Sequence, residues 1–169
     1  MNSEELPEPR WLDTDEQKIW YSVAYALNRL PAALDAQMQR DAGVSQFEYM
    51  VVSALSMAAE RTLRMSVLAE YTASTLSRLS NVVSRLEDRG WVRRTIDPTD
   101  RRASLATLTD KGWSKVVASA PAHVNEVRRL IFDPLTKAQQ RQLGQIAERI
   151  LKAIDPSRSA TARDMTGEP

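Results

Sequence analysis

The chain has 169 residues, with 23 lysines and arginines against 22 aspartates and glutamates, and 43% of its residues are apolar. This length suits one compact domain with a hydrophobic core, and the composition excludes collagen-like, low-complexity and wholly disordered chains. Because the chain has no cysteine, disulfides, thiol nucleophiles, cysteine-based redox sensors and zinc–thiolate sites are excluded as well.

The two ends of the chain carry no helix or strand pattern. Residues 1–14 are acidic and contain two prolines, and residues 155–169 are rich in small and polar residues, so we expect a flexible N-terminus and a flexible tail. The acidic start is unlike a secretory signal. No segment approaches the roughly 20 apolar residues that cross a bilayer. We therefore expect a cytoplasmic protein with no membrane contact.

A long amphipathic helix is predicted within residues 15–44. Its apolar positions recur every three or four residues, at Ile19, Trp20, Val23, Leu27, Leu30 and Leu34. Pro31 lies inside this pattern and is expected to kink or split the helix.

Residues 45–108 combine short helices with a change of period. The S-x-x-E pattern of Ser45 to Glu48 is a capping box that predicts a helix up to about residue 59. Further helices are expected over 66–71 and 75–89, the second ended by Gly90. Residues 91–96 and 103–108 then read as two strands of a hairpin, joined by a turn-rich, charged connector. This order is that of a winged helix-turn-helix.

Two further helices are expected over residues 109–154. Thr109 is a predicted N-cap of the first, which continues past Pro121 with a bend to about Phe132. Thr136 opens a second capping box, and the helix after it carries an apolar stripe formed by Leu143, Ile146, Ala147, Ile150, Leu151 and Ile154. The predicted fold class is mainly α with a small β-hairpin, a winged helix-turn-helix between N- and C-terminal dimerisation helices.

Charge is concentrated in residues 61–102, which carry nine arginines, no lysine and five carboxylates. Arginine suits bidentate contacts with phosphate or guanine and insertion into a narrow minor groove. A solvated helix surface is the alternative explanation for such a cluster.

The predicted helix 75–89 separates its apolar residues from a polar and cationic face. Serine and asparagine are weak helix formers, so their density on that face needs a reason, and reading the major groove of DNA is one. The candidate contact residues are Ser74, Thr75, Ser77, Arg78, Asn81, Ser84 and Arg85.

The hairpin tip offers a second contact, through Arg101 and Arg102. Asp100 cannot face phosphate favourably, so we expect an internal ion pair that orients a neighbouring arginine; an ordinary turn aspartate is the alternative. Arg64 is expected to contact backbone phosphate, or else to be a solvated arginine.

Several of these segments together resemble the MarR family of bacterial transcriptional regulators. The pattern R-L-E-x-R-G-W-V-x-R starts at Arg85, D-P-x-D-R-R-A starts at Asp97, and L-T-x-K-G starts at Leu108. The resemblance covers roughly residues 15–153. It implies that Arg102 probes the minor groove, that Asp100 is its structural partner, and that the chain forms a homodimer through its terminal helices.

A homodimer is also favoured by the broad apolar stripes of the terminal helices, although burial within one chain would explain them too. A two-fold dimer would bind a pseudo-palindromic double-stranded DNA operator. The resemblance further implies a repressor released by a small aromatic or phenolic effector. A candidate effector site is formed by Trp20, Tyr21, Tyr25, Phe47 and Met50. The alternative is that these side chains simply pack in the hydrophobic core.

An enzyme is not expected, since the glycines are isolated and His123, the one histidine, has no nucleophile nearby in the sequence. We interpret His123 as a packing or surface residue, and predict no metal site and no cofactor. The alternative function is a winged-helix interaction module that binds an acidic protein partner.

Overall fold

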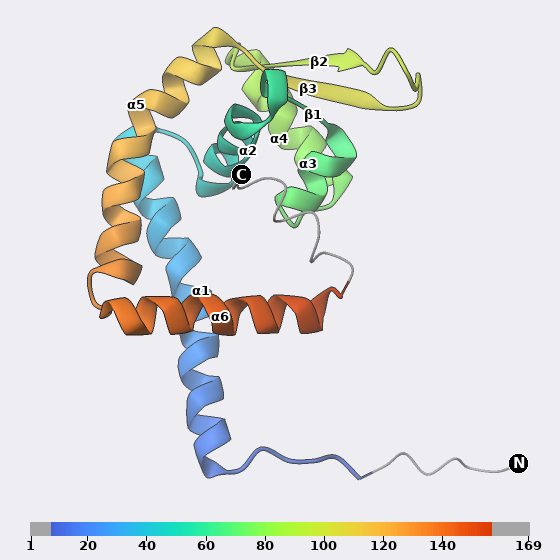
Figure 1. Ribbon diagram of the computed structural model, residues 1–169. Coiled ribbons are helices and arrows are strands. Elements are labelled where there is room, and N and C mark those ends of the chain that lie inside the picture. The colour runs from blue at the N-terminus through green and yellow to red at the C-terminus, as the bar shows by residue number, and fades with distance from the viewer. Residues whose placement is uncertain (1–7, 157–169) are drawn as a thin grey trace, which may run out of the picture. The chain divides into compact units, whose positions relative to one another are not determined.

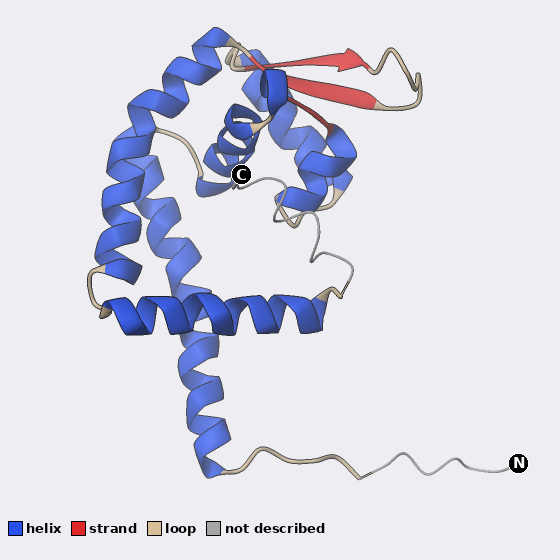
Figure 2. Cartoon of the chain, in the orientation of Figure 1, coloured by secondary structure: helices blue, strands red, loops and turns tan. Residues whose placement is uncertain are grey.

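The computed structural model describes residues 8–156, and the flexibility predicted for 1–7 and 157–169 lies outside the described residues. The described residues form mostly helices, with three short strands in the middle of the chain (Figures 1 and 2). Their order is α1 (Thr14–Ala42), α2 (Gln46–Met57), the 3₁₀ turn η1 (Ala59–Arg61), β1 (Thr62–Arg64), α3 (Met65–Tyr71), α4 (Leu76–Asp88), β2 (Val92–Ile96), β3 (Ser104–Leu108), α5 (Asp110–Val127), the π-helical turn η2 (Arg128–Phe132) and α6 (Lys137–Ile154). This confirms the predicted mainly α, winged helix-turn-helix fold; the dimerisation role predicted for the terminal helices stays a prediction.

The chain divides into two compact units, and the boundary between them lies within α1, between Ala33 and Leu34. The start of α1 is capped by Asp13, whose Oδ1 accepts hydrogen bonds from the amides of Asp15 and Glu16, both at 2.8 Å. The helix continues through Pro31, so the predicted split does not occur. Proline removes one hydrogen-bond donor, and the helix extends far enough on both sides to continue without it.

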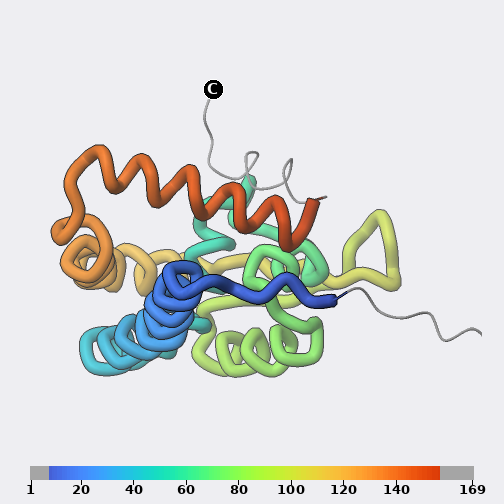
Figure 3. Tube along the Cα trace, turned by 90° about the horizontal axis from the view of Figure 1, so that it is seen from below, coloured from blue at the N-terminus to red at the C-terminus, as the bar shows by residue number. Residues whose placement is uncertain are grey.

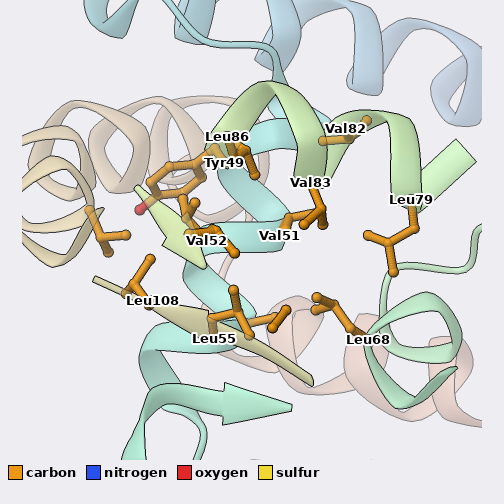
Figure 4. Packing of buried hydrophobic residues seen from close by; sticks show 14 of the residues in the cluster. Tyr49, Val51, Val52, Leu55, Leu68, Leu79, Val82, Val83, Leu86 and Leu108 are labelled. Atoms are coloured by element: carbon orange, nitrogen blue, oxygen red, sulfur yellow. The ribbon is translucent and has the colours of Figure 1, made fainter. Parts of the chain in front are cut away.

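The core of the second unit lies between α2, α3, α4 and the sheet. The predicted capping box is present: the Glu48 amide donates to Ser45 Oγ at 3.1 Å, and the Ser45 amide donates to Glu48 Oε2 at 2.9 Å. Figure 4 shows the apolar side of α4 packed on α2 and α3, with these side chains labelled: Leu79, Val82, Val83, Leu86, Val51, Val52, Leu55 and Leu68. The outer side of α4 is thereby fixed toward solvent.

The sheet has three antiparallel strands in the order β1-β3-β2. Its β2–β3 hairpin is the predicted one, and the loop after β2 projects from the helices (Figure 3, yellow-green). The sequence did not predict β1. A strand of three residues has no visible alternation, and its partner β3 lies far along the chain, where Thr62 faces Thr107.

Gly90 lies just before the first strand of the hairpin, and Gly112 lies just after the second. Gly90 has a φ of 71°, which explains why the helix ends there. Thr109 caps α5 as predicted, accepting a hydrogen bond from the Gly112 amide at 3.0 Å. A Cβ added to Gly112 would overlap the backbone carbonyl oxygen of Trp91. A glycine is therefore required where α5 crosses the start of β2.

The last helix, α6, begins at the second predicted capping box, formed by Thr136 and Gln139. Its apolar stripe is exposed; Ile146 and Ile150 retain 53% and 50% of their accessible surface. Among the described residues, none of the helices combines the length and apolar character needed to span a bilayer.

Substituting Gly112→Ala should lower the free energy of unfolding by about 1–3 kcal/mol, because the added methyl group forces α5 away from Trp91. Gly144→Ala in α6 is the matched control, since a Cβ there meets no atom within 4 Å. It should leave stability unchanged or raise it by up to about 1 kcal/mol. Urea unfolding of both variants makes the comparison; equal stabilities would contradict the packing described.

Candidate nucleic-acid interface

The outer side of α4 is short of carboxylates and keeps polar groups free. Thr75 caps the helix through a 3.2 Å hydrogen bond from the Arg78 amide, which is a local role for one predicted contact residue. Ser77, Arg78 and Asn81 are exposed, and their side chains make no hydrogen bond or ion pair within residues 8–156. These three groups are available to an external partner.

Arg78 is held by an aromatic ring. Its guanidinium carbon lies 4.4 Å from the ring centroid of Phe47, in the first turn of α2. A cation over an aromatic face is attracted by the ring quadrupole, and this contact leaves the N–H groups of the guanidinium free. Phe47, which we predicted in an effector site, thus also contacts an arginine of α4.

Glu48, the residue after Phe47, is buried and binds two arginines of the α4 region. Its Oε1 accepts from Arg85 Nε at 3.4 Å, and its Oε2 lies 3.5 Å from Arg89 Nη1. Burial alone would raise the pKa of Glu48, but the Ser45 amide and the charges of Arg89 and Arg85 outweigh it and lower the pKa. Arg85 is thus partly neutralised inside the protein.

Arg94 connects β2 to α4. Its Nε donates to Glu87 Oε2 at 2.6 Å, and its two terminal nitrogens donate to the hydroxyls of Ser80 at 3.1 Å and Ser84 at 2.9 Å. The Ser84 hydroxyl is therefore already used within the protein. Since side chains alternate along a strand, Arg93 points to the opposite side of the sheet, away from α4.

Arg64 anchors the base of the hairpin loop. Its Nε donates to Asp97 Oδ2 at 2.6 Å, and its Nη2 donates to Thr99 Oγ1 at 3.1 Å. Asp97 is buried, and hydrogen bonds from the Thr99 hydroxyl and amide, together with Arg64, lower its pKa to about 2. Sequence reasoning missed Asp97, although the D-P-T-D turn was visible.

At the loop tip, Arg101 and Arg102 extend into solvent. The Arg102 side chain is 93% exposed, and its amide and Nε donate to Asp100 Oδ1 at 3.1 and 3.3 Å. Arg101 has no ion pair or hydrogen bond to the part of the chain that the structure describes. The arrangement directs one or two positive charges away from the protein.

These contacts divide the predicted DNA-contact residues into two groups. Arg64, Ser84 and Arg85 have internal partners, and Ser74 shares a 3.0 Å hydrogen bond with the Thr72 hydroxyl. These four, with Thr75, thus also stabilise the surface from within, while Arg64 and Arg85 keep 46% and 53% of their side chains exposed. The side chains that remain free or extended are those of Ser77, Arg78, Asn81, Arg101 and Arg102. We call these five residues the free face.

Of the predicted effector residues, Trp20, Tyr21 and Tyr25 lie in the first unit, and Phe47 and Met50 lie in the second. Trp20, Tyr21 and Tyr25 are exposed on α1, whereas Phe47 contacts Arg78. The second unit has a cavity of about 490 Å³ between α5, η2 and α6, and its lining includes His123, Val124, Arg128, Phe132 and Lys137. His123 packs on Tyr49, with ring centroids 4.8 Å apart, and burial lowers the pKa of the histidine.

Comparisons with known proteins agree on one family. The family model described as "MarR family" matches residues 42–103. The crystal structure of Sco3205, a MarR family transcriptional regulator from Streptomyces coelicolor in complex with DNA, is 43% identical, with a TM-score of 0.85 over 90% of this chain and 96% of that chain. The chain belongs to the MarR family.

Two other MarR-type proteins give the same result. AbsC, a MarR family transcriptional regulator from Streptomyces coelicolor, is 31% identical, with a TM-score of 0.82 over 88% of this chain and all of that chain. The transcriptional repressor MprA of Escherichia coli is 25% identical over 119 residues, 70% of this chain and 67% of that protein. As a MarR family member, the protein is a DNA-binding transcriptional regulator and not an enzyme.

The Asp97 pair predicts a specific acid sensitivity. Because its pKa falls from 3.8 to about 2 on folding, Asp97 stabilises the fold above about pH 4, and this contribution is lost as the pH falls toward 2. Melting temperatures between pH 4.5 and 2 should therefore fall more steeply for the wild type than for Asp97→Asn. Thr99→Val, which keeps the amide donor but removes the hydroxyl, should lie between them; parallel curves would contradict the assignment.

Proposed function

We propose that this protein binds a specific double-stranded DNA operator, with α4 in the major groove and the β2–β3 loop in the neighbouring minor groove. The observation that carries the proposal is the free face: Arg78 and Arg101 form no ion pair within the described residues, and Arg102 keeps 93% of its side chain exposed beside Asp100. The neighbouring arginines Arg64, Arg85 and Arg94 are instead paired with Asp97, Glu48 and Glu87. Ser77 and Asn81 add small donors and acceptors between the charges, which suits contact with phosphates and base edges.

The side chains proposed for the major groove differ from the one proposed for the minor groove. Arginine and asparagine on a helix can pair with guanine and adenine edges in the major groove. An exposed arginine at a narrow loop tip fits the negative potential of a narrow minor groove. The similar protein Sco3205 has been crystallised in complex with DNA, which supports the same use of this fold here.

A homodimer is the second part of the proposal. The apolar stripe of α6 is half exposed in one protomer, and residues of α1 such as Ile19 and Leu27 are exposed as well. A second copy would cover such stripes and would space two α4 helices by roughly 34 Å, one turn of DNA. The expected operator is therefore pseudo-palindromic.

The third part is repression that a small aromatic or phenolic ligand relieves. Similarity to the transcriptional repressor MprA supports repression. A ligand can act only by favouring a dimer state that fits the operator poorly. The exposed aromatic side chains of α1 and the cavity beside α5 are the candidate surfaces for it.

Arg102→Ala should weaken binding to the selected operator by about 1–3 kcal/mol, which is roughly 5- to 150-fold. The operator is obtained by selection from random duplexes, and affinity is measured by fluorescence anisotropy. Arg93→Ala is the matched control, because Arg93 is an exposed arginine of the same hairpin that points away from α4. Equal effects of the two substitutions would refute a specific contact, and a protein that prefers no duplex would favour the acidic-protein alternative.

Placing charge in the α6 stripe should abolish the dimer. In the double variant Ile146→Glu/Ile150→Glu, two carboxylates would have to be buried without partners, so sedimentation should show a monomer at concentrations where the wild type is dimeric. Gln145→Glu adds a charge on the opposite side of α6 and should leave the dimer intact. A dimeric double variant would show that α6 is not in the interface.

A further inference from the structure

We infer that Phe47 is a positioning residue for DNA recognition, which holds the Arg78 guanidinium in place before DNA arrives. The inference rests on the proposed function. It adds a residue outside α4 and the β2–β3 loop to those that DNA binding depends on. Its basis is the 4.4 Å contact between the guanidinium carbon of Arg78 and the Phe47 ring centroid.

The first turn of α2 is built to hold α4. The Ser45 capping box fixes the backbone of this turn, so the side chains of Phe47 and Glu48, the second and third residues after the cap, have defined directions. Glu48 holds Arg85 and Arg89, whereas Phe47 holds Arg78. Two neighbouring residues thus contact three arginines of the α4 region.

The two kinds of contact have opposite effects on the arginines. A carboxylate takes up N–H donors and neutralises charge, as Glu48 does. An aromatic face attracts the cation but accepts none of its in-plane donors. Arg78 therefore keeps its full charge and its donors, and within residues 8–156 its guanidinium has no hydrogen bond or ion pair.

Holding Arg78 against a ring has a consequence for binding. A free arginine samples many rotamers and loses that freedom when it contacts DNA, whereas a restrained one loses less. Phe47 is half-buried against the core, so its ring forms a firm support. Losing the ring should therefore weaken operator binding even though Phe47 need not touch DNA.

A double-mutant cycle separates this role from general packing. Phe47→Leu keeps an apolar side chain but removes the ring, and it should weaken operator binding about three- to tenfold. In an Arg78→Ala background the same substitution should change affinity by less than about twofold. In an Arg102→Ala background, Phe47→Leu should keep its full effect, because Arg102 lies on the β2–β3 loop and not beside Phe47. Phe47→Tyr, which retains a ring, should restore binding.

Wild-type protein provides a second measurement that does not depend on a variant folding. Stacking over the ring should move the Arg78 δ-methylene proton resonances upfield of those of Arg101, and the shift should persist when the selected operator is added. A Phe47→Leu effect of equal size in the Arg78→Ala background would overturn the inference, as would Arg78 resonances without that shift. These results would leave the proposed function standing, whereas a wild type that selects no duplex would remove both.

Discussion

Ion pairing between buried carboxylates and arginines determines which positive charges this protein presents. Glu48 and Asp97 are almost completely buried and Glu87 is partly buried, and each binds an arginine of the α4 and hairpin region. A buried carboxylate left without its cation is strongly unfavourable, so these arginines stay with their partners. Arg78, Arg93 and Arg101 have no such partner within the described residues, and Arg102 extends into solvent beside Asp100. Of these, we propose that Arg78, Arg101 and Arg102 supply the charge that reaches an external anion.

The same ion pairs connect α2, α4 and the hairpin to one another. Arg94 connects β2 to α4 through Glu87 and two serines, and Arg64 connects the end of β1 to the hairpin loop through Asp97. Glu48 connects α2 to α4. With α4 and the hairpin loop held in a fixed relation, contacts in two adjacent grooves can form together, which costs less conformational entropy than ordering each part separately.

Local signals in the sequence were enough to predict most of the fold. Both capping boxes, the Gly90 stop and the hairpin depend on residues within a few positions of one another, and each is present. The strand β1 was missed because its evidence lies in pairing with β3, far along the chain. For the same reason the internal contacts of Arg85 and Ser84 were not foreseen: their partners Glu48 and Arg94 belong to other elements, and no local pattern reveals them.

The salt dependence of operator binding most directly tests which arginines contact DNA and which are held by internal carboxylates. Each phosphate contact contributes a slope of about 0.9 to the fall of log affinity with log salt concentration. If an arginine of the free face contacts phosphate, its replacement by glutamine should lower that slope by about 0.9, and we expect this for at least Arg101→Gln or Arg102→Gln. Arg64→Gln should leave the slope unchanged, even if affinity falls. A slope lowered by Arg64→Gln and unaffected by both hairpin variants would contradict the account.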